Sequence, residues 1–339
     1  MSMLEAIARV TEGEEISGAV LEAAFAEIMA GEATPAQIAA LLVGLRMKGE
    51  TVAEIVAVAR ALRAVADTAE AADPHTVDTC GTGGTGQDTF SISTTAAFVV
   101  AGAGLPVAKH GNRGVTSQTG SFDTLEALGV GIDLSIERCG EILREIGIAP
   151  FFARTAHPAF RHVGPVRAEI GVRTLLNCLG PLLNPVGARN QIVGVFSRSL
   201  VEPLAQALGE LGADRALVVH GSDGLDEITT TGSTHAALAE AGKVEAFAID
   251  PAQFGISPAR AEDLAGGNAQ ENAGLLRAIL AGETGPRRDI VCLNAAGALW
   301  AGRAAAGLDE GLGMAAESID SGAAAAKLEA LIEATGASV

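Results

Sequence analysis

The chain has 339 residues, of which 48% are hydrophobic, so it is long enough for one large or two modest globular domains. The formal net charge is -18, and aromatic residues make up only 3% of the chain, with no Tyr and one Trp. Both features argue against a nucleic-acid-binding surface, which needs basic stripes and stacking rings. We therefore expect partners that are small molecules, with no nucleic acid among them.

The cysteines and the apolar segments indicate a cytoplasmic protein that binds no membrane. The four cysteines form no C-x-x-C pair, which is typical of reduced thiols and argues against a zinc site. The N-terminal sequence "MSMLEAIARVTEGEEISG" lacks the basic region and apolar core of a signal peptide. Apolar stretches such as "AAFVVAGAGLPVA" are too short to cross a bilayer.

Residues 1–72 are predicted to form a small helical domain. Thr34 with Gln37, and Thr51 with Glu54, have the spacing of capping boxes that begin helices. Apolar residues follow the first box at helical spacing and are expected to face a core, with part of the apolar surface of the domain pairing with a second subunit. These residues are Ile38, Leu41, Leu42 and Leu45.

Residues 73–339 are predicted to form a large α/β domain. Short apolar runs alternate with helical segments, and their lack of polar alternation is typical of strands buried on both faces of a parallel sheet. The runs are "TVDTC", "LPVAKH", "IAPFFA", "NQIVGVFS", "RALVVHG" and "KVEAFAID". Helices are expected from Val201 to Leu211, from Asn272 to Leu280 and over the Ala-rich segment "GAAAAKLEALIEAT". The predicted fold class is thus α/β, with a mostly parallel central sheet flanked by helices and a small all-helical domain.

A glycine-rich turn follows the first strand, in "VDTCGTGGTGQDTFSIST". Gly81, Gly83 and Gly86 match the G-x-G-x-x-G spacing of a dinucleotide-binding turn, which also needs an acidic residue about 20 positions later. No Asp or Glu occurs between Asp88 and Asp123, and no Lys-Ser or Lys-Thr pair follows the glycines as in a P-loop. The turn is therefore interpreted as a general anion site at the start of a helix.

Cations follow the next strand, in "KHGNRGVTSQTGS". Lys109, His110 and Arg113 lie within five residues of one another in a chain that is otherwise acidic, while Gly111 and Gly114 allow close approach of a ligand to the backbone. Ligands of open α/β sheets bind beyond the carboxyl ends of the strands. We interpret this cluster as the positive part of a phosphate site.

Two further loops contain groups that suit a metal and a carboxylate. Asp226 and Glu227 follow the strand "RALVVHG", where adjacent carboxylates suit Mg²⁺, although capping of a helix would also explain them. The segment after "IAPFFA" contains guanidinium groups that can grip a carboxylate with two hydrogen bonds. They are Arg154, Arg161, Arg167 and Arg173. No Ser-His-Asp or Cys-His arrangement is evident by spacing, so electrostatic stabilisation and positioning are expected rather than covalent catalysis.

With these motifs in order, nearly the whole chain resembles the anthranilate phosphoribosyltransferase family. The resemblance rests on "GEATPAQIAALLVGLRMKGET", "CGTGG", "TFSIST", "KHGNRGVTSQTGS", "LEALGV", "HPAFRHVGPVRAEIGVRTLLNCLGPLLNP" and "VVHGSDGLDEIT". It implies a homodimer whose small domain also includes residues from about 163 to 183. It also implies a pentosyltransferase of tryptophan biosynthesis, which moves 5-phosphoribose from phosphoribosyl pyrophosphate (PRPP) to the amine of anthranilate with Mg²⁺ and releases pyrophosphate.

The resemblance also assigns site residues. Lys109, His110 and Arg113 would act in catalysis, with His110 either accepting the amine proton or donating to phosphate. Anthranilate would contact Gly81, Asn112 and Arg167, and Mg²⁺ would contact Ser93, Asp226 and Glu227. PRPP would contact Gly81, Gly84, Thr85, Thr89, Ser91, Ile92, Ser93, Thr94, Lys109, His110, Gly111, Asn112, Arg113, Gly114, Val115, Thr116, Ser117 and Ser121.

Two positions depart from the family pattern. Thr85 stands where the family usually has Asp, and Ser91 stands where it usually has Asn. These changes could weaken metal-linked PRPP binding, be offset by Asp88, or indicate a different acceptor; we expect the mildest case, since Asn112 and Arg167 are present. Alternative interpretations of the chain are a pyrimidine-nucleoside phosphorylase and a non-catalytic paralogue that binds nucleic acid.

Overall fold

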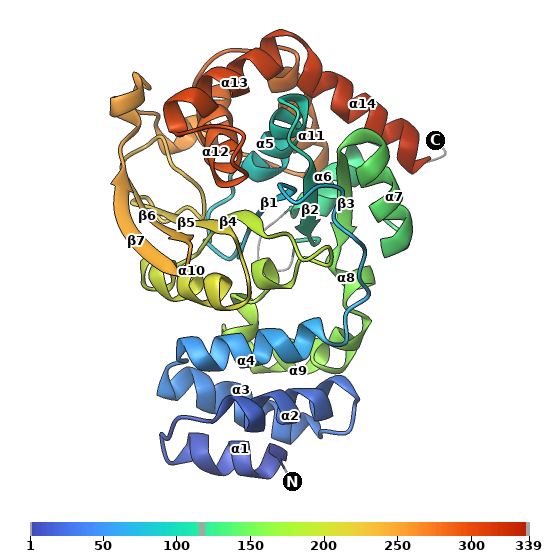
Figure 1. The fold of residues 1–339 in the computed structure, drawn as a ribbon, viewed down its shortest axis with the longest axis vertical. Coiled ribbons are helices and arrows are strands. Elements are labelled where there is room, and N and C mark those ends of the chain that lie inside the picture. Colours follow the sequence, from blue (N-terminus) through green and yellow to red (C-terminus); the bar gives the residue numbers. More distant parts are fainter. Residues whose placement is uncertain (1, 115–118, 337–339) are drawn as a thin grey trace.

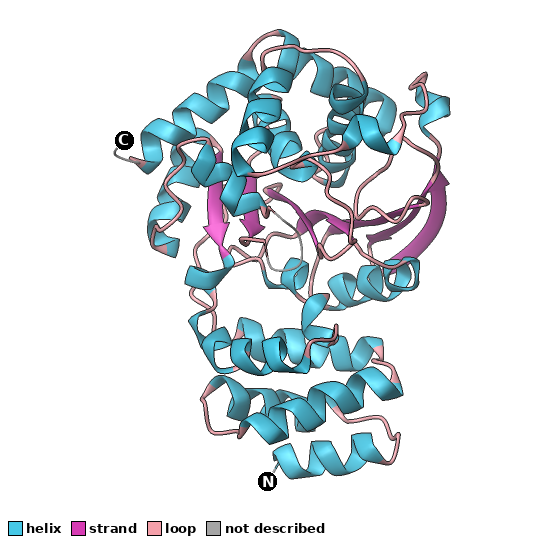
Figure 2. Ribbon diagram, turned by 180° about the vertical axis from the view of Figure 1, so that it is seen from behind, coloured by secondary structure: helices cyan, strands magenta, loops and turns pink. Residues whose placement is uncertain are grey.

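The computed structural model describes residues 2–114 and 119–336, and its N-terminal part is a stack of helices (Figures 1 and 2). These are α1 (Ser2–Thr11), α2 (Gly18–Met29), α3 (Pro35–Lys48) and α4 (Val52–Arg63). Both predicted capping boxes are confirmed, since the side chain of Thr34 accepts from the amide of Gln37 and that of Thr51 from the amide of Glu54. Ile38, Leu41, Leu42 and Leu45 are buried as expected.

A later part of the chain returns to this helical stack. It includes α8 (Ala153–Ala156) and α9 (Gly164–Ile170), and α9 packs against α3 at the back of the stack in Figure 1. Val163, Val166 and Leu175 share one hydrophobic cluster with the four N-terminal helices. The same cluster continues into Val193 and Val218 of the sheet. The domain limits 1–72 and 73–339 therefore stay a prediction, as does the contribution from about 163 to 183.

The larger part is built on a seven-stranded sheet in the described residues. Its strands are β1 (Val77–Gly81), β2 (Val107–Gly111), β3 (Ile148–Phe152), β4 (Asn190–Gly194), β5 (Arg215–Gly221), β6 (Thr234–Glu240) and β7 (Lys243–Ile249). Their spatial order is β3-β2-β1-β4-β5-β6-β7. The five strands from β3 to β5 pair in parallel, and β6 and β7 are antiparallel. The predicted fold class is confirmed.

The far edge of the sheet differs from the sequence-based prediction. "KVEAFAID" was expected to be a buried strand, but β7 is an antiparallel edge strand whose residues are mostly exposed. It forms a hairpin with β6, through Ala241 and Gly242, which both have positive φ as a tight two-residue turn requires. The strand β6 was not predicted, because its Ala-rich sequence carries little β preference of its own.

Helices cover both faces of the sheet (Figure 1). One face packs against α5 (Ile92–Gly102), α11 (Ala269–Leu280), α12 (Pro286–Ala301), α13 (Leu308–Asp320) and α14 (Ala323–Thr335), whereas α10 (Val201–Glu210) lies between the other face and the helical stack. The helices α6 (Ser121–Ala127) and α7 (Ile136–Ile146) lie near β2 and β3. The helices predicted from the sequence in this part are thus confirmed. In the described part of the chain, no helix has the length and apolar character needed to span a membrane.

The connectivity places a ligand site beyond β1. From β1 the chain continues to β2 and β3 on one side and then crosses to β4 and β5 on the other. The strand order therefore reverses at β1, and ligands of open α/β sheets bind in the crevice outside the carboxyl ends of the strands at such a reversal. The glycine turn begins at this point, where β1 ends.

Candidate active site

The glycine turn after β1 has backbone angles that residues with a side chain rarely adopt. Gly83, Gly84 and Gly86 have φ values of 63°, 74° and 74°, in the left-handed region that glycine adopts readily. The amide of Thr82 donates to the carbonyl of Gly194 at 2.9 Å, so the turn leaves the sheet beside the end of β4. The predicted anion-binding turn is therefore anchored to the strand next to β1 at the reversal point.

The carboxylate of Asp226, which follows β5, contacts this turn. Oδ2 of Asp226 accepts a 2.8 Å hydrogen bond from the amide of Gly83. A Cβ atom on Gly194 would lie 1.6 Å from the carbonyl oxygen of Asp226, so only glycine at the end of β4 lets the two loops meet. The fold thus brings together residues that the sequence places far apart.

Burial makes the two acidic groups costly to ionise. Burial raises the pKa of Asp226, and it raises that of Glu227 to about 8 with the nearby charge of Asp226 as the second cause. Lys109 opposes the shift at Glu227. Two partly buried carboxylates side by side favour a cation, since an opposite charge stabilises their ionised forms.

The predicted metal ligands fit a hard divalent cation. Ser93 and Glu227 line one small cavity of about 10 Å³, close to the space of a single water molecule. Hydroxyl and carboxylate oxygens are ligands that Mg²⁺ accepts, and Mg²⁺ usually keeps waters and substrate oxygens in its remaining positions. Within residues 2–114 and 119–336 no three His, Cys, Asp or Glu side chains cluster as a metal cage. A site with few protein ligands therefore suits Mg²⁺ bound together with a substrate.

Lys109 lies deep behind the turn. Its side chain is buried, and Nζ donates to the carbonyl of Thr79 at 2.8 Å. Burial lowers the pKa of Lys109, whereas Asp78 is the first of the groups that oppose this shift. The ammonium group therefore supplies positive charge from behind the end of β1.

Asp78 is a buried residue of the site that the sequence-based prediction missed. Its Oδ1 accepts from the amide of His110 at 3.2 Å, and its Oδ2 accepts from Nδ2 of Asn184 at 2.8 Å. Burial raises the pKa of Asp78, and the hydrogen bond from Asn184 opposes this shift. An acidic residue within the apolar run "TVDTC" is the signal that could have revealed it. Through its hydrogen bond with the amide of His110, Asp78 holds the end of β2 against β1, at the point where the predicted cation cluster begins.

His110 is buried beside a second histidine. Its Nδ1 lies 3.2 Å from the carbonyl oxygen of Gly180, and because a carbonyl only accepts, Nδ1 carries the proton. Its ring centroid lies 5.3 Å from that of His157, and its Nε2 has no partner among the described residues. Burial lowers the pKa of His110 to about 3, so the ring is neutral and Nε2 is a free acceptor.

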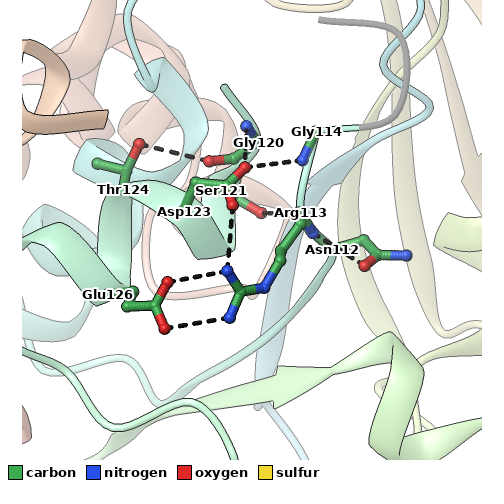
Figure 3. Close-up of polar contacts among 8 residues, drawn as sticks. All are labelled: Asn112, Arg113, Gly114, Gly120, Ser121, Asp123, Thr124 and Glu126. Atoms are coloured by element: carbon green, nitrogen blue, oxygen red, sulfur yellow. Dashed lines mark hydrogen bonds and ion pairs between the residues drawn. The ribbon is translucent and has the colours of Figure 1, made fainter. Parts of the chain in front are cut away.

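Arg113 is turned toward α6 (Figure 3). Its two terminal nitrogens donate to Glu126 at 2.9 and 3.1 Å, and Nη1 lies 3.7 Å from Asp123. Oδ2 of Asp123 accepts from the amides of both Gly114 and Gly120, so it joins the two described ends of this loop. Val115, Thr116 and Ser117, which the family resemblance assigns to PRPP, lie outside the described residues. The role predicted for Arg113 stays a prediction.

The remaining predicted PRPP residues surround the start of α5 and α6. The hydroxyl of Ser91 lies 2.7 Å from that of Thr124, and Thr85 Oγ1 accepts from the amide of Gln87. Thr89 pairs with Ala265 in an isolated bridge. The other side chains lie as follows: Ile92 and Thr94 are buried, Ser121 Oγ donates to the carbonyl of Asn112, and the Asn112 side chain accepts from the amide of Arg113.

Two of the four candidate arginines lie on or just after α9, and one of them contacts the glycine turn. Arg167 is half-buried on α9, burial lowers its pKa, and within the described residues its side chain has no hydrogen bond or ion pair. Arg173 donates to the carbonyl of Gly84 at 2.9 Å, and its guanidinium stacks 4.6 Å above the ring of Phe196. Arg167 is therefore available to an acceptor, while Arg173 is tied to the glycine turn.

The two parts of this architecture match the two domains of a known protein family. Residues 73–325 match the α/β domain of a glycosyl transferase family, and residues 4–66 match the helical bundle domain of the same family. The fold and site thus define a transferase of glycosyl groups. The protein is 51% identical to an anthranilate phosphoribosyltransferase of Symbiobacterium thermophilum over 96% of both chains. It is 52% identical to that of Moorella thermoacetica, over 97% of this chain and 98% of the relative. The chain belongs to the anthranilate phosphoribosyltransferase family.

Solved structures agree with this assignment. An anthranilate phosphoribosyltransferase from Thermus thermophilus superposes with a TM-score of 0.93 at 43% identity, covering 97% of this chain and 99% of that chain. The enzyme from Saccharomyces cerevisiae, in complex with PRPP and Mg, superposes with a TM-score of 0.90 at 27% identity, covering 98% and 97%. The resemblance predicted from the motifs is confirmed. Neither the nucleoside phosphorylase nor the nucleic-acid-binding alternative is supported by these relatives.

Proposed function

We propose that this protein transfers 5-phosphoribose from PRPP to the amine of anthranilate, giving N-(5-phosphoribosyl)anthranilate and pyrophosphate in tryptophan biosynthesis. The observation that carries the proposal is the contact of the Asp226 loop with the glycine turn at the strand reversal, in a chain of this family. Lys109 bonds to the carbonyl of Thr79, and Thr79 lines the same small cavity as Ser93 and Glu227. The relative from yeast, crystallised with PRPP and Mg, supports the same substrates.

The proposed metal ligands are Ser93, Asp226 and Glu227, which hold Mg²⁺ together with substrate oxygens. When bound, Mg²⁺ neutralises negative charge on the diphosphate and so makes it a better leaving group. The raised pKa values of both carboxyl groups support this assignment, because a bound cation favours their ionised forms.

The residues of the chain bind and orient the reactants. Amides of the glycine turn and the ammonium group of Lys109 stabilise the negative charge that the diphosphate gains as its bond to C1 of the ribose breaks. The sugar gains positive character at C1, and the neutral amine of anthranilate attacks there without losing a proton beforehand. Holding the two reactants in line is the main catalytic task of the protein.

The acceptor is proposed to bind between the α9 segment and β2. The free guanidinium of Arg167 suits the carboxylate of anthranilate, and Asn112 and Gly81 complete the predicted acceptor site. His110 is buried and its Nε2 is enclosed by the protein, so the proposed contribution of His110 is to hold the end of β2 in place through its contact with the carbonyl of Gly180. Its low pKa makes His110 a weak base, so positioning is the proposed role.

We also propose a cytoplasmic homodimer joined through the helical stack. Leu4 on α1 and Met47 on α3 are exposed apolar side chains on this part, with 64% and 82% of their surfaces accessible. Burying them against a second copy removes apolar surface from water. Light scattering on the purified protein should give twice the chain mass, and a monomer mass would contradict this assembly.

The test of the activity follows the fluorescence of anthranilate in a mixture with PRPP and Mg²⁺. We expect the fluorescence to fall with wild-type protein and to stay constant when EDTA replaces Mg²⁺. The variant Arg167→Ala should raise KM for anthranilate far more than KM for PRPP. Constant fluorescence with wild-type protein, together with phosphorolysis of a pyrimidine nucleoside, would overturn the proposal.

A further inference from the structure

The carboxylate of Asp226 occupies a backbone donor that a substrate diphosphate would use. Its Oδ2 accepts the amide hydrogen of Gly83 at 2.8 Å, in the turn that the sequence predicts to bind an anion. The same oxygen lies 2.5 Å from the position that a Cβ atom on Gly81 would take, so it rests directly against the turn. The protein thus supplies its own anion to this amide.

Several contacts hold the loop of Asp226 in this position. The carboxylate of Asp223 accepts from the amide of Leu225 and from the hydroxyls of Thr229 and Thr231. The side-chain amide of Gln87, in the glycine turn, donates to the carbonyl of Asp223. The two loops are therefore joined at two places, and the Asp226 contact belongs to a built arrangement.

This arrangement opposes binding of a bare diphosphate. To accept a hydrogen bond from the amide of Gly83, the diphosphate must displace the carboxylate of Asp226. The carboxylate then loses this hydrogen bond but remains close to the diphosphate. Two negative groups would face each other in a partly buried site, where like charges repel more strongly than in water. A divalent cation removes this conflict because it gives the carboxylate a new partner and neutralises the diphosphate.

We propose that Asp226 determines specificity for the metal complex of the substrate, by filling the amide of Gly83 until a divalent cation draws its carboxylate away. This role rests on the proposed function and goes beyond binding the metal. It makes the cation and the diphosphate bind cooperatively, since each one favours the same displacement of Asp226. A metal-free diphosphate therefore binds more weakly than its metal complex.

The test measures pyrophosphate binding by calorimetry, in EDTA and in Mg²⁺. In Asp226→Asn the amide oxygen still accepts from Gly83 but the charge is gone, whereas Asp226→Ala frees the amide completely. We expect metal-free pyrophosphate to bind tighter in the order wild type, Asp226→Asn, Asp226→Ala, with a gain of about tenfold for Asp226→Ala. The gain produced by Mg²⁺ should shrink in the same order.

A control separates the local contact from total charge. At pH 9, above the Glu227 pKa of about 8, Glu227→Gln also removes one negative charge from the site but leaves the amide of Gly83 filled by Asp226. It should therefore gain less metal-free affinity than Asp226→Asn. Circular dichroism melting checks that each variant folds, and Asp226→Asn carries the test if Asp226→Ala does not fold.

The outcomes are distinct from those of the activity assay. Metal-free pyrophosphate affinity that is equal in wild type and the Asp226 variants, or undetectable in all of them, would overturn the inference. An equal gain for Glu227→Gln and Asp226→Asn would also overturn it, because general repulsion would then suffice. Failure of the proposed function would show in wild-type protein alone, as anthranilate that is not consumed.

Discussion

Arg173 joins the α9 segment to the glycine turn, because its guanidinium donates a 2.9 Å hydrogen bond to the carbonyl of Gly84. The carbonyl of Arg173 in turn accepts a 2.7 Å hydrogen bond from Arg46, at the end of α3. A short chain of hydrogen bonds thus runs from the helical stack to the proposed phosphate site. These hydrogen bonds fix the position of the segment that contains Arg167 relative to the glycine turn, which is proposed to bind PRPP.

This relationship predicts that Arg173→Ala raises KM for PRPP by about three- to tenfold, since losing one hydrogen bond to a charged group costs roughly 1 kcal/mol or more at the affected site. Stability should change little, because the side chain is exposed. Arg173→Lys should lie in between, as it keeps a cation but loses the flat stacking on Phe196. Steady-state kinetics check this, with the exposed Arg161→Ala as the matched control. An equal KM in Arg173→Ala and Arg161→Ala would contradict the coupling.

Thr85 is predicted to be a conservative departure from the family. Its hydroxyl accepts from the amide of Gln87 at 3.2 Å, and an Asp side chain forms the same kind of turn. We therefore expect Thr85→Asp to leave the dependence of the rate on Mg²⁺ and PRPP unchanged, whereas Thr85→Ala, which removes the acceptor, should raise KM for PRPP. Rates measured over a series of Mg²⁺ concentrations check this. A lower Mg²⁺ requirement in Thr85→Asp would show that Thr85 is a functional departure.

The ion pair of Arg113 with Glu126 allows the role of Arg113 to be tested. The pair is exposed, so Glu126→Ala should change the free energy of unfolding by no more than about 0.5 kcal/mol. If Arg113 binds PRPP as predicted, Glu126→Ala leaves KM for PRPP equal or lower, because the guanidinium is released. Arg113→Ala should raise that KM at least tenfold. The same rise in both variants would mean that Arg113 serves only to hold α6.

Burial of His110 should make the folded protein less stable in acid. The pKa of His110 is about 3 in the folded protein because of burial, and the ordinary value of about 6.5 applies when the chain is unfolded. Between these values the unfolded chain binds more protons, so stability falls as pH decreases through this window. The slope is up to about 1.4 kcal/mol per pH unit. His110→Asn should lose this contribution, and its free energies of unfolding at pH 7 and pH 5 should differ by about 2 kcal/mol less than those of wild type.

Urea unfolding at the two pH values checks the acid prediction. The exposed His75→Asn serves as the matched control and should behave as wild type does. His157 also has a pKa lowered by burial, so its contribution has the same sign and stays in all these variants. An unchanged pH dependence in His110→Asn would show that His110 is accessible to protons in the folded protein.

Features that depend only on neighbouring residues could be predicted from the sequence. The capping boxes at Thr34 and Thr51 are formed as predicted, because each needs only a partner three residues away. The glycine turn was recognisable for the same reason, since its φ values are a property of the local chain. Motif order along the chain was enough to indicate the family.

The contacts that combine these motifs into one site could not be predicted in this way, because they form only in the folded chain. Asp226 and Gly83 are separated by 143 positions, and Arg173 and Gly84 by 89, yet each pair is in hydrogen-bond contact. The β6–β7 hairpin and the burial of Asp78 likewise depend on which strands pair and pack. Such contacts arise only when the whole sheet assembles, because strand order and burial are set by the total packing of apolar surface and not by any short stretch of residues.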